Sequence, residues 1–415
     1  MAQRSGQVGN VFKRLHLTLV LAGVVGVLTG IAVAAFEFSV SHALEWVLSQ
    51  RTLILMTVPA LGLVAVAVLT RVVGDSDTTT TDAYVRAYHR PGGRLYPRSA
   101  INKVIGSAIT IGSGNAFGFE GPSMLIGGTI GSSVRNRFGL RAGDHDAKVL
   151  MVAGAAAGVA AVFKAPLTGL IFALEVPYHS DIARRALLPA LTASATAYLT
   201  YVSIVGVNPL IATGGTSPFD FSDLVWGLAL GVACGVLARL GAWLLELGKS
   251  TTLPLAQRVG IAAVVMIILA PLAIHFVGGP EHMGPSYRVI ELAMDPSTGL
   301  KVLIIVFVMR AVATWVGVFG GGMGGLFIPL VTQGAVVGSI FQRLVDAPNP
   351  YLFPTIGISA LLGSGYNTPL AGVAFAAEAT GQPGFLVPAL LATVVARLIV
   401  GGQSFSSYQL LERPG

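Results

Sequence analysis

The stretch GSGNAFGFEGP, residues 112–122, places a single carboxylate, Glu120, among glycines between two apolar runs. A charge inside a membrane is costly, so such residues mark ion or proton pathways by default. The glycines let the backbone approach a ligand, and Pro122 suits the first turn of a helix whose free N–H groups attract anions. We therefore predict that a helix begins here and that Glu120 lies on an ion pathway.

The composition indicates an integral membrane protein. The 415 residues are 53% hydrophobic and only 11% charged, with a mean hydropathy of +0.75. Long apolar runs near the ~20 residues that cross a bilayer predict spans at residues 17–40, 53–73, 224–245, 261–277, 302–319 and 385–400. Shorter runs predict helices that stop inside the membrane, at residues 101–111, 121–134, 149–162, 167–174 and 352–362.

Charge distribution predicts the orientation. Residues 1–16 are mostly polar, and the apolar run after them is too long for a signal-peptide core, so we expect a retained first span. Basic residues follow the second run at Arg86, Arg90, Arg94, Arg98 and Lys103, whereas only Arg51 separates the first two runs. The N-terminus is therefore predicted to be cytoplasmic in a multi-pass cell-membrane protein. Such loops also explain the net charge of +7, and we predict no nucleic-acid partner.

The two halves of the chain contain similar segments. KAPLTGLIFALE, residues 164–175, matches NTPLAGVAFAAE, residues 367–378, and their prolines are 203 residues apart. A second match pairs residues 118–132 with residues 325–339, 207 residues apart. Paired interrupted helices of this kind indicate a duplicated unit with a binding site near the membrane midplane. We expect inverted repeats at residues 17–210 and 211–415, after a cytoplasmic segment of residues 1–16.

At these residues the chain resembles the CLC family of chloride channels and chloride/proton antiporters. GFEGP, residues 118–122, is similar to the family's Gly-(Lys/Arg)-Glu-Gly-Pro motif, and GLFIP, residues 325–329, to its Gly-x-Phe-x-Pro motif. The similarity covers roughly residues 17–410. It implies a divergent, prokaryotic-type member without regulatory domains: an all-helical homodimer of inverted repeats with broken helices, in which each protomer has its own anion pathway and Glu120 is the gate.

The resemblance and the predicted helix N-termini together give a set of candidate anion ligands. Backbone N–H groups near Gly118, Phe119, Glu120 and Gly121 and near Gly325, Leu326 and Phe327 would supply partial positive charge. The family's serine loop aligns with Thr79, and its tyrosine ligand with Ser406, two residues before Tyr408. Either Ser406 or Tyr408 is then the hydroxyl expected there.

Two further departures from the family pattern bear on mechanism. Phe119 replaces the basic residue before the gate and removes a positive charge from the pathway. Val176 stands where many antiporters carry an internal proton-transfer glutamate, beside the retained Glu175. These substitutions favour passive or weakly proton-coupled anion transport, with chloride as the default ion. The alternatives are a chloride/proton antiporter and, third, a fluoride-selective transporter.

Several residues also have structural interpretations. The spacing of Gly127 and Gly131 is typical of close helix packing. The equivalence of Glu175 and Glu378 favours a shared structural role, such as accepting backbone N–H groups, over a proton path. Lys164 either attracts anions or forms a structural hydrogen bond. Asp144-His145-Asp146 is better explained as a helix cap than as a metal site.

An enzyme is not predicted. The sequence contains no P-loop, zinc-binding helix or dinucleotide fingerprint, and no nucleophile paired with a base. We therefore predict no cofactor and no metal site. Glu120 itself has a competing interpretation as a structural carboxylate in a salt bridge with a neighbouring helix. The predicted partners are halide anions, protons, the lipid bilayer and a second copy of the chain.

Overall fold

A computed structural model describes residues 2–74, 79–137, 148–208, 210–211, 213 and 220–412, with the side chains of residues 2–14 and of residue 136 outside that description. Asp144, His145 and Asp146 lie outside the described residues. Throughout the described ranges the regular secondary structure is helical, with isolated backbone bridges as the β-type pairing. The predicted all-α class is confirmed.

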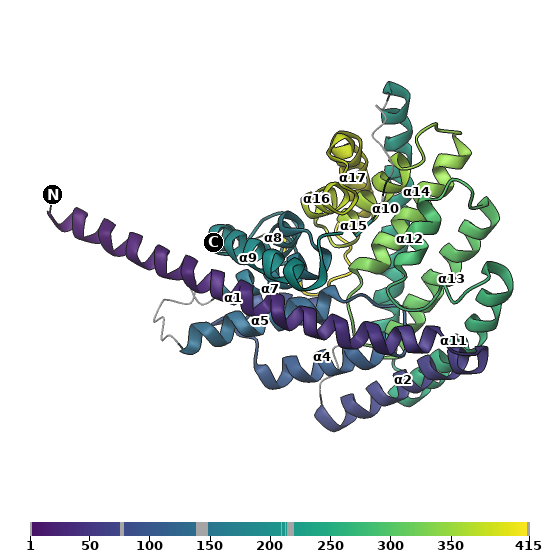
Figure 1. The fold of residues 1–415 in the computed structure, drawn as a ribbon, viewed down its shortest axis with the longest axis horizontal. Coiled ribbons are helices and arrows are strands. Elements are labelled where there is room, and N and C mark those ends of the chain that lie inside the picture. Colours follow the sequence, from purple (N-terminus) through teal and green to yellow (C-terminus); the bar gives the residue numbers. More distant parts are fainter. Residues whose placement is uncertain are drawn as a thin grey trace.

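The described part of the first half of the chain contains nine helices. They are α1 (Ala2–Leu48), α2 (Thr52–Val73), α3 (Thr80–His89), α4 (Pro97–Gly112), α5 (Glu120–Arg137), α7 (Val149–Phe163), α8 (Pro166–Glu175), the short 3-10 helix η1 (Arg184–Ala186) and α9 (Leu187–Val205). Figure 1 shows α1 running past α5, α7 and α4, with its N-terminal turns extending beyond the rest of the chain.

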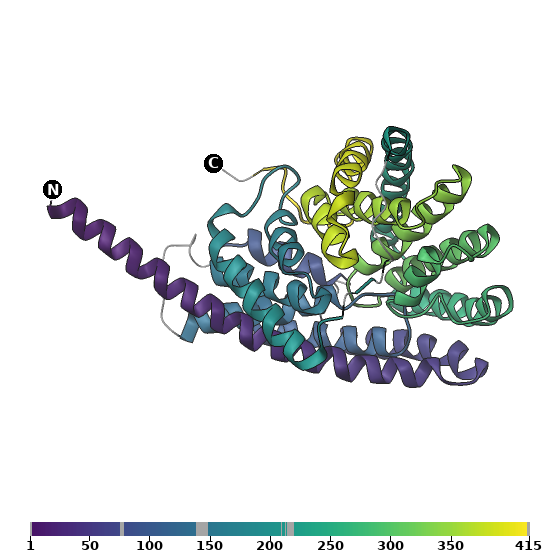
Figure 2. The ribbon, with the colours of Figure 1, turned by 45° about the horizontal axis from the view of Figure 1, so that its top comes forward.

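The second half repeats the pattern of long helices followed by short ones. It contains α10 (Phe221–Ser250), α11 (Leu255–Val277), α12 (Tyr287–Met294), α13 (Leu300–Phe319), α14 (Phe327–Leu344), α15 (Leu352–Gly365), α16 (Pro369–Thr380), the 3-10 helix η2 (Pro383–Phe385) and α17 (Leu386–Val400). In Figure 2 the two halves lie side by side, with the purple-to-teal first half beside the green-to-yellow second half.

All six predicted long spans are present as apolar helices. A seventh, Arg184–Val205, was missed by the sequence analysis because its mean hydropathy of 1.3 is low for a span. Alanine, serine and threonine make up much of this helix. Small residues suit a helix that packs closely on its neighbours, and Ala190, Ala193 and Ala197 are fully buried.

The short helices pack in equivalent pairs within the two halves. In the first half α5 packs on α7, and in the second α14 packs on α15. Glycines make both contacts close: Gly127 lies directly against the Gly154 carbonyl oxygen, and its repeat counterpart Gly334 lies against that of Gly357. Neither position has room for a Cβ atom. Gly131 lies in the same way against the Leu150 carbonyl, so the packing interpretation of Gly127 and Gly131 is confirmed.

Glu175 and Glu378 each bind the first turn of the other half's helix. Glu175 accepts the backbone N–H groups of Leu370 and Ala371 at 3.3 and 2.9 Å, at the start of α16. Glu378 accepts those of Leu167 and Thr168 at 2.9 and 2.7 Å, at the start of α8. A carboxylate satisfies the free N–H groups and complements the helix dipole. This confirms their shared structural role, with the refinement that each joins the two repeats.

Lys164 also forms a structural contact. It follows α7 in the left-handed conformation, with φ 53°, and its Nζ donates to the Asn208 carbonyl at 3.1 Å. Asn367, its repeat counterpart, has the same conformation, with φ 55°. The hydrogen-bonding interpretation of Lys164 is therefore confirmed.

Candidate functional site

The N-termini of α5 and α14 meet through a reciprocal backbone pair. The Gly118 N–H donates to the Gly325 carbonyl at 2.9 Å, and the Gly325 N–H donates to the Gly118 carbonyl at 3.0 Å. These two glycines are equivalent in the sequence repeat. The repeat accounts for the reciprocal bonds, because two equivalent residues that meet each make the same contact with their counterpart. The junction brings two helix N-termini, and therefore two positive dipole ends, to one buried point.

The Glu120 carboxylate occupies this junction. Its side chain is buried, and Oε1 accepts the Phe327 backbone N–H of α14 at 2.6 Å. Side chains at Gly118 or Gly325 would collide with the carboxylate, so glycine at both positions leaves the space that it fills. Oε2 has no hydrogen-bond partner among the described residues. A negative group therefore sits where a helix N-terminus binds anions, with one oxygen available for a proton.

Apolar packing fixes the backbone around the carboxylate. The buried Phe119 ring contacts Phe36 of α1 edge-on, with ring centroids 6.1 Å apart. Phe327 packs among aromatic rings, with centroids 4.5 Å from Phe163 and 5.0 Å from Phe375. These contacts hold the first turns of α5 and α14 rigidly, and a rigid donor is pre-organised for an anion.

Threonine hydroxyls approach the same junction from the start of α3. Thr79 pairs with Gly324 in a parallel backbone bridge, and the Thr80 N–H donates to the Gly324 carbonyl at 3.4 Å. The Thr80 hydroxyl lies against the Cα atom of Gly121, which has no room for a side chain. The hydroxyls of Thr80 and Thr81 are buried and have no hydrogen-bond partner among the described residues. Unpartnered buried hydroxyls are costly, so these two are free donors for a ligand.

The two hydroxyls singled out by alignment have a different partner in this structure. Thr79 Oγ1 donates to Asp82 Oδ2 at 2.5 Å, and Ser406 Oγ donates to Asp82 Oδ1 at 2.7 Å. Asp82 was not a predicted site residue, because in the sequence it only ends a run of threonines. The Thr80 hydroxyl, which lies against Gly121 beside Glu120, has no hydrogen-bond partner among the described residues, whereas that of Thr79 is bonded to Asp82.

Two tyrosines lie in different surroundings: Tyr408 is partly exposed, whereas Tyr366 is buried in the site. Tyr408 is 37% exposed, and the Arg86 guanidinium lies over its ring at 5.5 Å from the centroid. Tyr366, which directly follows α15, is buried, and its hydroxyl lies close to the Thr81 side chain and the Leu326 backbone N–H. Tyr366 is therefore a site residue that the sequence analysis missed, and it stacks loosely on Phe405 beside Ser406.

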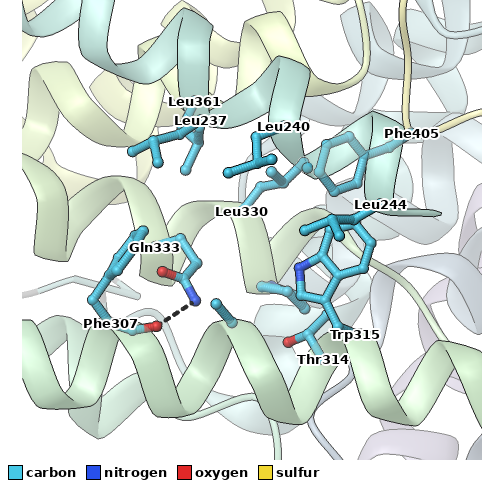
Figure 3. A pocket seen from close by; sticks show the side chains of 13 residues that line it. Leu237, Leu240, Leu244, Phe307, Thr314, Trp315, Leu330, Gln333, Leu361 and Phe405 are labelled. Carbon is cyan, nitrogen blue, oxygen red and sulfur yellow. Dashed lines mark hydrogen bonds between the residues drawn. The ribbon is translucent and has the colours of Figure 1, made fainter. Parts of the chain in front are cut away.

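A well-formed cavity elsewhere has a different character. It measures about 130 Å³ and lies between α10, α13, α14 and α15, as Figure 3 shows. Leu237, Leu240, Trp315 and Leu330 dominate its walls. Gln333 points into it and donates to the Phe307 carbonyl at 3.2 Å. An apolar space of this kind offers little to an anion, so we place the site at Glu120.

A comparison with known protein families identifies the family to which the chain belongs. The model of the voltage gated chloride channel family matches residues 61–401, most of the chain. The chain belongs to the CLC family. Its members are anion transport proteins, and the matched region contains both glycine-rich helix starts, Glu120 and Tyr366.

Solved structures of CLC proteins share the fold. A slow cyanobacterial Cl−/H+ antiporter is 23% identical with a TM-score of 0.81, covering 92% of this chain and 94% of its own. A CLC-type fluoride/proton antiporter is 22% identical with a TM-score of 0.81, covering 96% and 98%. A eukaryotic CLC transporter is 18% identical with a TM-score of 0.73, covering 95% of this chain and 73% of its own. The predicted CLC-type fold, a multi-pass membrane protein of inverted repeats with broken helices, is confirmed.

Val176, which the sequence resemblance aligned with the family's internal proton-transfer glutamate, is fully buried directly after α8. Its carbonyl accepts the Gln409 side-chain N–H at 2.9 Å, and the same amide donates to the Tyr366 carbonyl at 2.7 Å. An amide bridge thus joins this position to the Tyr366 backbone. Valine cannot carry a proton, so any proton route through this point needs another group.

Proposed function

We propose that this CLC protein carries small anions, chloride by default, across the cell membrane past Glu120, with passive or weakly proton-coupled transport. The observation that supports it most is the Glu120 carboxylate accepting the Phe327 N–H at 2.6 Å, where two helix N-termini converge. A halide has the same charge and seeks the same donors. Glu120 and the anion are therefore competitors for one site.

The opening step is protonation of Glu120. A neutral carboxyl group loses its attraction to the N–H groups of α14, and its Oε2 already lacks a partner. The side chain then leaves, and an anion takes the donors of Leu326 and Phe327. The hydroxyls of Thr80, Thr81 and Tyr366 complete the site, because partial charges bind an ion without holding it as tightly as a fixed cation does.

The direct test is anion efflux from liposomes as a function of pH. Wild-type flux should rise as the pH falls, because protonation removes the competing carboxylate. Glu120→Gln should give high flux at every pH, since the amide has no charge to lose. A Glu120→Gln variant that keeps the wild-type pH dependence would refute the gate. A variant that unfolds would also contradict it, because unfolding would assign Glu120 to a structural salt bridge.

Antiport is the second candidate, and the supporting observation is the fold shared with Cl−/H+ and fluoride/proton antiporters. Val176 speaks against tight coupling. A chloride gradient imposed across liposomes, with internal pH recorded, separates the two. Uphill proton movement would establish exchange, and efflux without it would support passive transport. Repeating the measurement with fluoride tests the third candidate, fluoride selectivity.

The proposal also covers the oligomeric state of the protein and its orientation in the membrane. We infer a homodimer, because large apolar side chains are exposed on α8, α9, α16 and α17, including Leu167, Leu191, Leu370 and Leu390. Lipid covers such residues equally well, so mass determination in detergent is the test. The basic residues after α2 support a cytoplasmic N-terminus.

A further inference from the structure

Asp82, in the first turn of α3, is a second buried carboxylate and accepts hydrogen bonds from four donors. Its side chain is 4% exposed. Oδ2 accepts from Lys249 Nζ at 2.9 Å and from Thr79 Oγ1 at 2.5 Å. Oδ1 accepts from Ser406 Oγ at 2.7 Å and from the Ser407 N–H at 3.0 Å. The donors come from α3, α10 and the C-terminal segment, so Asp82 ties three separate parts of the chain together.

In the ion pair of Asp82 and Lys249, the carboxylate is buried and Lys249 faces a polar cavity. Its side chain is 29% exposed, much more than that of Asp82, and Nζ also donates to Ser407 Oγ at 2.6 Å. The cavity measures about 500 Å³ and is lined by Lys249 together with Glu246, Gln403, Ser404, Ser406 and Gln409. The cation is therefore reached from the cavity first, and the carboxylate lies behind it.

The pair is connected to the Glu120 junction through the backbone. Thr79 and Thr80 bond to Gly324, the neighbour of the Gly325 that pairs with Gly118. The Asp82 cluster and the Glu120 junction are therefore joined by Thr79, which bonds to Asp82, and by Thr80, whose hydroxyl lies against Gly121.

We propose that Lys249 captures anions from this cavity and that Asp82 is a second carboxylate gate, which an anion must displace from Lys249, Thr79 and Ser406 to reach Glu120. This inference rests on the proposed anion transport. The donors held by Asp82, an ammonium, two hydroxyls and a backbone N–H, are those that a halide uses.

The pairing also solves a physical problem of capture. A lone lysine in a confined site binds an anion tightly and slows its release. When Asp82 lies beside the lysine, the incoming anion replaces a carboxylate of equal charge. The donors are therefore occupied both before and after the exchange. The charges of the pair also attract anions locally while keeping the net charge of the site small.

Cysteine chemistry gives a specific test. Cys234 is the one cysteine of the sequence and is buried, so Lys249→Cys adds a single accessible thiol. Half-saturating chloride concentration for efflux should rise roughly threefold or more on losing one partly exposed charge contact. Attaching an aminoethyl group through a methanethiosulfonate reagent restores the ammonium and should restore the wild-type value. A sulfonatoethyl group, of opposite charge, should raise it further.

Asp82→Asn provides the reciprocal variant, and Lys301→Gln, an exposed lysine on α13, the matched control. Asp82→Asn should lower the half-saturating concentration, because Lys249 then lacks its competing carboxylate. The control should leave it unchanged. All values are normalised to folded dimer or monomer by size-exclusion chromatography, so a loss of folding is not counted as a loss of capture.

The outcomes separate this inference from the proposed function. If wild-type protein carries no halide, both fail. If wild-type flux is present and Glu120→Gln removes its pH dependence, but both thiol adducts and Asp82→Asn match wild type, only the second gate fails. If the ion pair is merely structural, the half-saturating chloride concentration of the folded protein is equal for the two adducts. Capture predicts the wild-type concentration for the aminoethyl adduct and a raised one for the sulfonatoethyl adduct.

Discussion

The two repeats begin their central helices with the same glycine and the same proline and differ at the three residues between them. Gly118 and Gly325 pair with each other, and Pro122 and Pro329 follow at the same spacing. Glu120 of the first repeat is the counterpart of Phe327 in the second, and the Phe327 N–H is the donor that Glu120 binds. A symmetrical scaffold therefore provides two anion-attracting helix ends, and one substitution gives one of them a carboxylate that fills the site. Under the proposed function, gating arises from the residue at which the repeats differ, and anion binding from the features that they share.

The largest expected effect comes from breaking the symmetrical scaffold itself. Gly127→Val and Gly334→Val place side chains against the backbone carbonyls of Gly154 and Gly357. Each should destabilise the protein by about 1–3 kcal/mol or more, because the backbone cannot yield. Gly260→Val, where no atom lies within 4 Å, is the control. Thermal unfolding in detergent measures the effect, and a large difference between the first two variants would show that the packing of the two repeats is not equivalent.

A smaller effect should follow from cutting the links between the repeats. Glu175→Ala and Glu378→Ala each leave two backbone N–H groups at the start of a helix without their carboxylate partner. Each should cost about 0.5–2 kcal/mol of stability, the usual cost of losing the cap of a helix N-terminus. Glu291→Ala, on the exposed surface of α12, should cost little. If proton transfer were the main role of Glu175, its variant would lose coupling while keeping the wild-type melting temperature.

The smallest effect concerns a single hydroxyl. Tyr366→Phe removes the hydroxyl close to Thr81 and Leu326, and should weaken halide binding roughly two- to tenfold, the usual value of one hydrogen bond. Tyr408→Phe should change nothing, because its ring packs on Arg86 and is partly exposed. Calorimetric titration with chloride distinguishes them. The reverse result would assign the ligand to Tyr408, as the alignment allowed.

The sequence predicted what local pattern and repetition determine. Six spans followed from hydropathy, and the equivalence of Glu175 and Glu378 followed from the repeat, including their structural role. The seventh span was missed because close packing, rather than hydropathy, selects its small residues. Repeat arithmetic also shows that Glu120 and Phe327 are counterparts, but it gives no distance between them.

Contacts between distant segments lay beyond the sequence. Lys249 ends a long helix and Asp82 ends a run of threonines, and neither position indicates the ion pair that the fold creates between residues 167 apart. Tyr366 had a weak signal: it is the counterpart of Phe163 in the repeat, so its hydroxyl is the added feature. A polar group added to one copy of a repeated apolar position is therefore a useful sign of a site.

Competition between Glu120 and an anion is the central claim, and equilibrium binding tests it most directly. Chloride affinity of the purified protein is measured by calorimetry across pH, for wild type and for Glu120→Gln. The account predicts that wild-type affinity strengthens as the pH falls, whereas the variant binds tightly at every pH. Equal affinities with the same pH dependence in both proteins would contradict it.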